Sequence, residues 1–193
     1  LGFLDGIADA GQRASAIVHN MLQFSRKSKI EMEKTDLAQL MEQTLDLAVV
    51  DYDLKKRFDF RKIEVVRELE PGVPAVSCVA SEIQQVLLNL LRNAAQAFSQ
   101  APDELETTPR IVIRLARKSD RVMIEVEDNG PGMDDQTRKR VFEPFFTTRP
   151  PGEGTGLGLS VSYFIICDEH SGEMRVESAP GQGSRFIIGL PLV

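Results

Sequence analysis

Amide side chains recur at helical spacing in one segment of the sequence, at Gln85, Asn89, Asn93 and Gln96. Residues three and four apart share one face of an α-helix, so these amides would form a stripe beside an otherwise apolar surface. An amide oxygen is a hard neutral ligand suited to Mg²⁺, and ATP phosphates would supply the negative charge. A solvated helix face would show the same pattern, so the spacing alone leaves both interpretations open.

Asp128 ends an apolar segment and opens the sequence D-N-G-P-G, residues 128–132. Glycines there would let the backbone approach a ligand closely. A carboxylate accepts hydrogen bonds, so Asp128 can take one from the exocyclic amine of adenine, whereas guanine would place a carbonyl oxygen against it. Asp and Gly are also common turn residues, and the motif alone fits a simple turn.

A second glycine cluster, G-T-G-L-G-L at residues 154–159, precedes an apolar run that predicts a helix. Glycines before a helix suit anion binding, because exposed amides and the positive end of the helix dipole can face phosphates. The cluster lacks the lysine of a P-loop and does not follow a strand as a dinucleotide-binding turn does. Taken singly, it fits a flexible hinge equally well.

The aromatic segment Phe142–Phe146 lies just before these glycines and is suited to anchor a lid over a bound nucleotide, although a plain hydrophobic patch is the competing interpretation. Arg149, Arg138 and Arg140 are candidate contacts for phosphates or for a partner. The two arginines flanking Lys139 also fit a solvated helix.

The elements that must position these residues alternate between helices and groups of strands. A helix with its core face at Ile83, Leu87 and Leu90 would carry the amides, starting at a Ser81 capping box completed by Gln84. Another helix is predicted over residues 37–47. Strands are predicted near residues 63–69, 75–79, 110–116, 121–128, 173–178 and 185–191. This order favours an α+β fold with a mostly antiparallel sheet packed on helices.

The first 33 residues differ from the rest. Apolar residues between Phe3 and Phe24 keep a heptad spacing, which predicts a long helix that packs in a bundle. A polar linker follows, so we predict a domain boundary near Glu33, with a helix and linker over residues 1–33 and a second domain over 34–193. Because the chain begins with Leu1, we expect a piece of a longer protein.

Composition excludes several classes of function. A net charge of −6 argues against a general nucleic-acid binder. No apolar stretch is long enough to cross a bilayer, so we expect no membrane contact and a cytoplasmic location, with a membrane anchor elsewhere in the parent protein still open. Cys78 and Cys167 lie far apart, which favours buried reduced thiols.

The motifs in combination are far more specific than each alone. N-L-L-R-N-A at 89–94, D-N-G-P-G-M at 128–133, F-E-P-F-F-T-T at 142–148 and G-T-G-L-G-L at 154–159 closely resemble the nucleotide-binding boxes of two-component sensor histidine kinases. That family belongs to the superfamily of gyrase, chaperone, kinase and mismatch-repair ATPases. The resemblance covers roughly residues 35–193 and implies a two-layer α/β sandwich.

The resemblance also implies a site that binds ATP and Mg²⁺. Asn93 would hold the metal with Asn89 beside it, Asp128 would read adenine, and Gly130 and Gly132 would shape the base pocket. The other implied ATP-binding residues are Arg92, Met133, Phe142, Arg149, Gly154, Thr155, Gly156, Leu157, Gly158 and Leu159.

The heptad helix resembles the second helix of the family's dimerisation and phosphoacceptor hairpin. The partner helix, with the acceptor histidine, would then lie upstream of Leu1, so this chain would hold no catalytic residue and would be unable to phosphorylate itself. The resemblance implies a homodimer through that hairpin and a response-regulator receiver domain as partner. His19 lacks the acceptor's usual neighbours, and we interpret His19 and His170 as solvated residues.

One position separates a kinase from an ATPase. Water-activating members of the superfamily carry a glutamate four residues before the metal-binding asparagine, and here that position is Asn89. An amide cannot take a proton from water, which favours transfer to histidine over hydrolysis. Gln96 and His170–Gly172 depart from the family pattern without touching the ATP-binding residues. An ATPase and a nonenzymatic, nucleotide-dependent regulator remain the alternatives.

Overall fold

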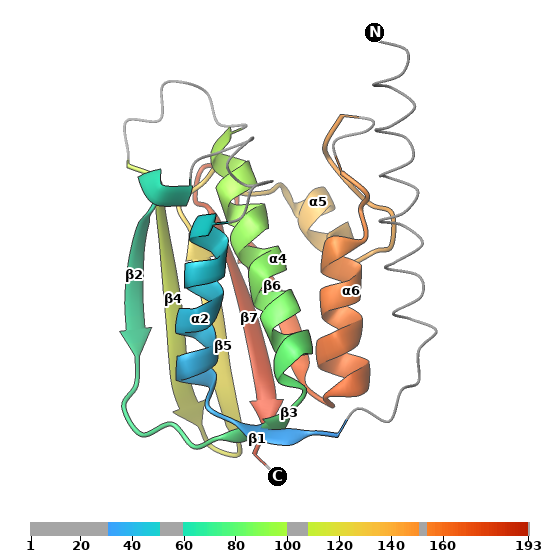
Figure 1. Ribbon diagram of the computed structural model, residues 1–193. Helices are drawn as coiled ribbons and strands as arrows, with labels where there is room; N and C mark the ends of the chain where they lie inside the picture. The colour runs from blue at the N-terminus through green and yellow to red at the C-terminus, as the bar shows by residue number, and fades with distance from the viewer. Residues whose placement is uncertain (1–30, 51–59, 100–107, 151–153, 193) are drawn as a thin grey trace, which may run out of the picture.

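The computed structural model describes residues 31–50, 60–99, 108–150 and 154–192 (Figure 1). The predicted heptad helix lies outside these residues, and the predicted domain boundary stays a prediction. In chain order the elements are β1 (Glu33–Thr35), α2 (Leu37–Val50), η1 (Phe60–Lys62), β2 (Glu64–Leu69), β3 (Val76–Cys78), α4 (Ala80–Ser99), β4 (Arg110–Lys118), β5 (Arg121–Asp128), α5 (Asp135–Arg140), α6 (Gly158–Phe164), η2 (Ile165–Glu169), β6 (Glu173–Ser178) and β7 (Ser184–Pro191).

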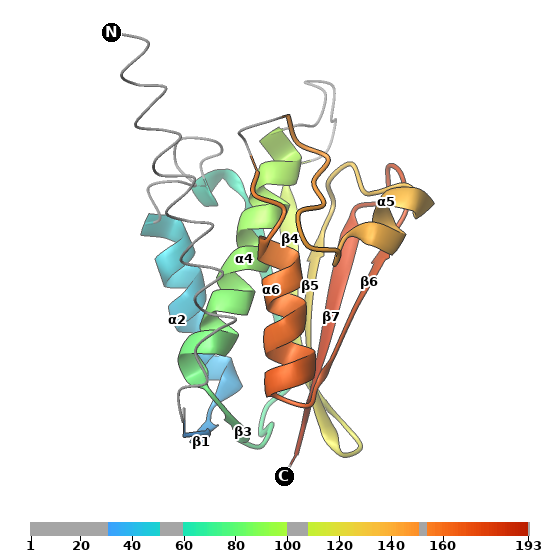
Figure 2. The same ribbon diagram turned by 90° about the vertical axis from the view of Figure 1, so that its right-hand side faces the viewer.

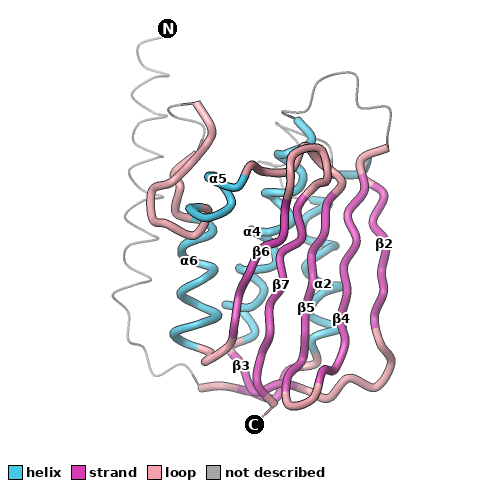
Figure 3. Tube along the Cα trace, turned by 180° about the vertical axis from the view of Figure 1, so that it is seen from behind, coloured by secondary structure: helices cyan, strands magenta, loops and turns pink. Residues whose placement is uncertain are grey.

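Five strands form the main sheet in the order β2-β4-β5-β7-β6 (Figure 3). The β2 and β4 strands pair in parallel, and every other neighbouring pair in this sheet is antiparallel. The short strands β1 and β3 pair separately as an antiparallel ribbon. The prediction of a mixed, mostly antiparallel sheet is confirmed.

The molecule has two layers. Figures 1 and 2 show α2, α4 and α6 side by side on one face of the sheet. Side chains alternate along a strand, so β5 turns Val122, Ile124 and Val126 toward the helices, and all three are buried. The α4 helix has an apolar stripe that includes Leu87 and Leu90, which are also buried. The predicted two-layer α+β sandwich is therefore confirmed.

The start of α4 differs from the prediction. The helix begins at Ala80, and the amides of Glu82 and Ile83 donate to the carbonyl of Val79 at 3.0 and 3.1 Å. Ser81 therefore lies inside the first turn, so its assignment as the capping residue is wrong. The serine and Gln84 fit the capping pattern by type, but a helix capped by Ser81 would begin at Glu82, and α4 begins two residues earlier, at Ala80.

His170 is also not the solvated residue that the sequence suggested, because only 4% of it is exposed. Its Nδ1 lies 2.8 Å from the carbonyl oxygen of Ile165, and its Nε2 accepts from the Val79 amide at 3.0 Å. The ring therefore donates through Nδ1 and accepts through Nε2, which makes it neutral. It joins the π-helical turn η2 to the residue before α4, and this contact between distant segments has no local sequence signal.

The remaining local predictions agree with the structure. The second predicted helix is α2, and all six predicted strands are present with boundaries within two residues. Cys78 is buried and Cys167 is half-buried, and both are free thiols. The ribbon strand β1 and the π-helical turn η2 were not predicted, because three residues or one turn give too short a pattern.

Candidate functional site

A cavity of about 290 Å³ opens between α4, α6, the loop after β5 and residues 146–149. Its wall brings together residues from all four predicted motifs. The lining residues are Asn89, Arg92, Asn93, Gln96, Ala97, Asp128, Pro131, Gly132, Met133, Thr137, Val141, Phe146, Thr147, Thr148, Arg149, Gly154, Thr155, Gly156, Gly158, Leu159, Ser184 and Phe186.

Most of the predicted ATP-binding residues lie on this wall, and three lie behind it. Leu157 is buried in the core between the helices. The Phe142 ring packs 5.2 Å from the ring of Tyr163 and 6.4 Å from that of Phe186, measured between centroids. Gly130 supports the neighbouring Asp128 through its backbone. These residues shape the wall from behind, so their direct contact with ATP stays a prediction.

The amides of α4 are the polar part of the inner wall. The Asn89 Nδ2 donates to Ser162 Oγ at 3.0 Å, which ties α4 to α6. The Asn93 Oδ1 accepts from Arg149 Nη2 at 3.1 Å. The Asn93 Nδ2 is buried and has no hydrogen-bond partner among the described residues. A buried amide donor without a partner costs about 1–3 kcal/mol, which marks this position as unusual.

Asp128 is the buried acid of the site, with 6% of the residue exposed. Its Oδ1 accepts from the Gly130 amide at 2.9 Å. Burial raises the pKa of the Asp128 carboxyl from its usual 3.8 to about 6, the nearby Glu127 adds to the rise, and backbone hydrogen bonds from Gly130 and Ser184 oppose it. At neutral pH the group is therefore mostly a carboxylate, an acceptor held in a largely dehydrated wall.

Backbone geometry holds this loop in place. Gly132 has φ +68°, and a Cβ there would lie 2.0 Å from the Ala179 carbonyl oxygen. Only glycine fits so close an approach. Ser178 Oγ accepts from the Met133 amide at 2.8 Å and donates to the Gly183 carbonyl at 2.8 Å. The loop after β5 is thus clamped to the turn between β6 and β7.

The predicted glycine cluster lies beside the amides. Gly158 opens α6, and a Cβ there would meet Asn89 Oδ1 at 2.4 Å, so the glycine permits the close packing of α6 on α4. Gly154 would place a Cβ 3.0 Å from Thr147 Oγ1 and 3.1 Å from Arg149 Cδ. The second glycine cluster therefore packs against both α4 and the segment before it.

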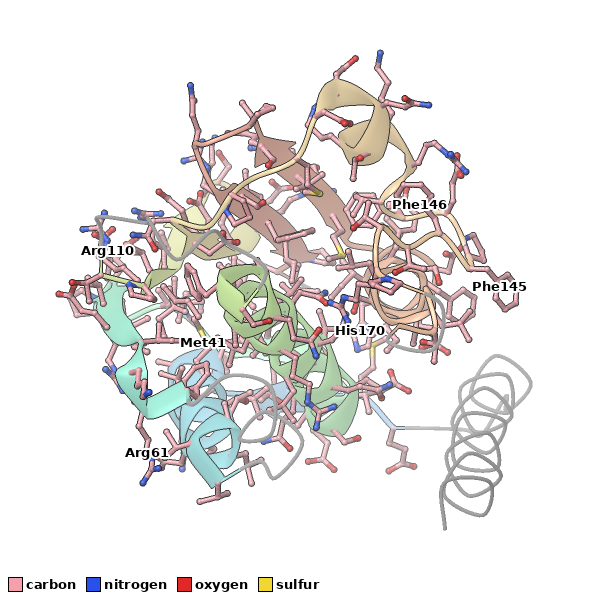
Figure 4. All side chains as sticks on the ribbon, turned by 90° about the horizontal axis from the view of Figure 1, so that it is seen from above. Met41, Arg61, Arg110, Phe145, Phe146 and His170 are labelled. Atoms are coloured by element: carbon pink, nitrogen blue, oxygen red, sulfur yellow. The ribbon has the colours of Figure 1, made fainter. Side chains whose placement is uncertain are left out.

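The aromatic segment contributes less than expected. Figure 4 shows Phe145 at the outer edge of the molecule and Phe146 farther in, and Phe145 is 59% exposed. Phe146 lines the cavity, with the Arg140 guanidinium 4.4 Å from its ring centroid. The segment does bring an aromatic ring to the wall, but the ring belongs to Phe146 and not to the predicted Phe142.

Sequence reasoning did not assign several wall residues. Ser184 and Phe186 lie in the sequence S-x-x-G-x-G-S-x-F at residues 178–186, which leads into the last strand. Thr147 and Thr148 follow the aromatic motif directly. Their positions in these motifs were the available signal. Pro131 lies within the motif at 128–133 but was given no role. The wall residues Ala97, Thr137 and Val141 have no distinctive signal, because such residues at these spacings are common everywhere.

The fold and the cavity define an α+β nucleotide-binding domain, and the comparisons with known proteins agree. Residues 78–193 match the family model described as histidine kinase-, DNA gyrase B-, and HSP90-like ATPase. The chain belongs to this family, and within it is the ATP-binding catalytic domain of a two-component sensor histidine kinase.

Individual relatives cover nearly the whole chain. Sporulation kinase E of Bacillus subtilis is 33% identical over 94% of this chain and 22% of its own length. The signal transduction histidine-protein kinase AtoS of Escherichia coli is 37% identical over 91% of this chain and 26% of its own length. The histidine kinase ThkA, solved in complex with the response regulator protein TrrA, is 25% identical with a TM-score of 0.73, over 99% of this chain and 51% of that one.

The chain therefore spans about a quarter of the length of these curated relatives. Within the residues that the structure describes, no helix combines the length and apolarity needed to span a bilayer. The predictions of a sensor-kinase catalytic domain that binds ATP are confirmed, and the residues assigned to the site remain predictions that the geometry supports.

Proposed function

We propose that this chain binds Mg·ATP in the cavity and passes the γ-phosphoryl group to a histidine on a dimerisation hairpin, from which it is relayed to an aspartate of a response-regulator receiver domain. The observation that carries the proposal is the meeting of Asp128, Asn93 and the second glycine cluster on one wall. A buried acceptor for a base, an amide for a metal and glycines for phosphates are the parts that ATP requires.

Asp128 is suited to select adenine. The Gly130 and Ser184 amides hold the carboxylate, and its two oxygens have further lone pairs for the exocyclic amine of the base. In a wall with little water, a guanine carbonyl placed there would face another acceptor and leave both unpaired. The loop clamped by Ser178 keeps the carboxylate at a fixed position.

Asn93 is suited to hold Mg²⁺. Its oxygen accepts a hydrogen bond from Arg149, and both residues line the cavity, so a hard, neutral oxygen is turned toward the bound ligand. Asn89 fits less well as a direct ligand, because its amide group is tied to Ser162 and its oxygen lies against Gly158. When bound with ATP, Mg²⁺ neutralises phosphate charge during transfer.

Transfer to histidine fits the site better than hydrolysis. Asn89 occupies the position where a general base would activate water, and its side chain donates a hydrogen bond instead of accepting a proton. An acceptor imidazole, by contrast, brings its own nucleophilic nitrogen and needs only positioning and charge stabilisation. An ATPase would require a different base on this wall.

The partner proteins follow from the same proposal. We infer a homodimer through the N-terminal helical hairpin of the whole protein and a cytoplasmic site of action. The solved complex of ThkA with the response regulator protein TrrA supports a receiver domain as the partner.

The test follows the γ-phosphate of labelled Mg·ATP, incubated with this chain in the presence and absence of a phosphoacceptor hairpin from its parent protein. We expect acid-labile label on the hairpin and none on the chain alone. The Asp128→Asn variant should lose this transfer, whereas Glu127→Gln, which changes the neighbouring acid on the opposite sheet face, should keep it.

If free phosphate is released at a rate that the hairpin does not change, the chain is an ATPase and the kinase proposal is wrong. Label retained on the isolated chain would instead point to an acceptor within it, with His19 as the first candidate. Either result would overturn the proposed division between this domain and the hairpin.

A further inference from the structure

A positively charged side chain holds the oxygen that we assign to the metal. Arg149 Nη2 donates to Asn93 Oδ1 at 3.1 Å, and both residues lie on the cavity wall. Arginine only donates, so the Asn93 side chain must turn its oxygen toward Arg149. The amide nitrogen then points into the protein, where it is buried without a partner among the described residues.

The contact with Arg149 leaves the buried Asn93 Nδ2 without a hydrogen bond among the described residues. A buried amide donor lacks the hydrogen bond that water would give it, so the contact with Arg149 is made at a cost to the Asn93 side chain. The contact is therefore only weakly favoured, and a stronger ligand for the Asn93 oxygen could displace Arg149.

Mg²⁺ and a guanidinium do not share one amide oxygen well. A metal ion binds its oxygen ligands at about 2.1 Å, which would leave a dication close to the Arg149 cation. Like charges at that separation repel, and most strongly where water is scarce. Binding of the metal therefore disfavours the contact between Arg149 and Asn93.

Displacement of Arg149 would be transmitted to its neighbours. The Arg149 amide donates to Thr147 Oγ1 at 3.1 Å, and both Thr147 Oγ1 and Arg149 Cδ lie close to Gly154. The side chain that contacts α4 and the start of the second glycine cluster therefore belong to one packed unit. Loss of the contact with Asn93 would remove the hydrogen bond that ties this unit to α4.

Resting on the proposed function, we propose that Arg149 and Mg²⁺ compete for the Asn93 amide oxygen, so that metal loading detaches residues 147–149 from α4. Arg149 is then a positioning residue that couples the metal to the segment beside the phosphates.

The experiment uses ADP, which lacks the γ-phosphate, and measures its affinity by calorimetry with saturating Mg²⁺ and with a chelator. The ratio of the two affinities reports the metal dependence and removes effects common to both conditions. In Arg149→Ala this ratio should rise about tenfold, the equivalent of one charge-assisted hydrogen bond no longer lost to the metal. Arg67→Ala, which removes an exposed cation of β2 that does not line the cavity, should leave the ratio unchanged.

A double-mutant cycle sharpens the test. The Asn93→Ala variant lacks the amide oxygen for which Arg149 and the metal would compete. Adding Arg149→Ala to it should therefore not raise the metal dependence. Hydrogen exchange gives a second readout without activity. In the native ADP complex, Mg²⁺ should speed exchange of the amides at residues 147–149, and in Arg149→Ala exchange should be equally fast with and without the metal.

The outcomes separate this inference from the function beneath it. If the native chain does not bind ADP, the proposed function fails. If it binds ADP with a metal dependence that Arg149→Ala leaves unchanged, the competition is refuted while the function stands. A rise that Arg67→Ala reproduces would also refute it, because general loss of positive charge would then explain the effect.

Discussion

The two faces of the sheet differ in how their charged side chains are paired and exposed to water. Figure 3 turns the sheet face away from the helices toward the viewer. On this face acidic and basic side chains pair across neighbouring strands. Arg114 on β4 contacts Glu68 at 2.5 Å and Glu127 at 2.5 Å, and Arg185 on β7 pairs with Glu177. On the helix-covered face, Asp128 is buried, and its pKa is raised chiefly by loss of water.

This difference separates structure from function. Exposed, paired charges such as the Arg114 cluster keep a sheet face soluble and contribute little each. A buried acid without a nearby cation lowers stability, and a fold retains such a group where a ligand requires it. The unpaired Nδ2 of Asn93 on the same wall follows the same logic. These two buried groups of the cavity lower the stability of the free chain, and a bound ligand would account for them.

The largest expected effect comes from removing the buried charge while keeping its shape. Asp128→Asn should weaken ADP binding about 30- to 100-fold at pH 7, because the amide that replaces the second oxygen would place a donor against the adenine amine. Calorimetric titration of the variant beside native chain and Glu127→Gln measures it. The native affinity should also fall between pH 7 and pH 5, as Asp128 protonates, and the variant's should not. An affinity within threefold of native would remove Asp128 from base recognition.

The same substitution should act on stability in the other direction. The folded chain holds the Asp128 proton more tightly than the unfolded chain, since the folded pKa of about 6 exceeds the usual 3.8. Stability from this group is therefore full below about pH 4 and declines as pH rises to 6. At pH 7 Asp128→Asn should raise the free energy of unfolding by on the order of 1–3 kcal/mol, and at pH 4 by much less.

Denaturant titrations of both chains at pH 4 and pH 7 give the comparison, with Glu127→Gln again as the matched control. A variant that is less stable than the native chain at pH 7 would mean that the carboxylate is stabilised in the fold by partners stronger than its backbone hydrogen bonds. The claim that charge on the helix-covered face lowers stability would then be wrong.

The sequence predicted the fold well because its signals were local. Strand alternation around Val122–Val126 and the helical stripe at Leu87 and Leu90 depend on neighbours a few residues away. The four motifs also meet at one cavity, and their combination was the signal, since the motifs of Asp128 and Asn93 taken singly also fit a turn or a solvated helix face. The sequence identified glycines such as Gly132 as part of the site, and the structure adds the reason, which is the close approach of a neighbouring backbone.

Predictions failed where a contact joins distant segments. The bond from Val79 to His170 spans 91 residues, and the bond from Arg149 to Asn93 spans 56, so no periodicity reports either. The parallel pairing of β2 with β4 is of the same kind, because the strands themselves were predicted but their direction depends on the whole sheet. Such contacts decide which polar groups are satisfied, and a motif cannot show that.

The smallest expected effect lies on the open face and tests the other half of the comparison. Arg114→Gln removes the cation between Glu68, Glu125 and Glu127, and the remaining acids then repel one another. Because these groups are partly solvated, the loss in free energy of unfolding should be only about 0.5–1 kcal/mol at low salt and smaller still at 1 M salt. Urea titrations at both salt concentrations measure it, and Arg67→Gln, which breaks the more exposed pair with Glu42, should cost less. ADP affinity should not change in either variant. A loss above 2 kcal/mol, or one that salt does not reduce, would mean that the open face depends on its charges as strongly as the cavity does.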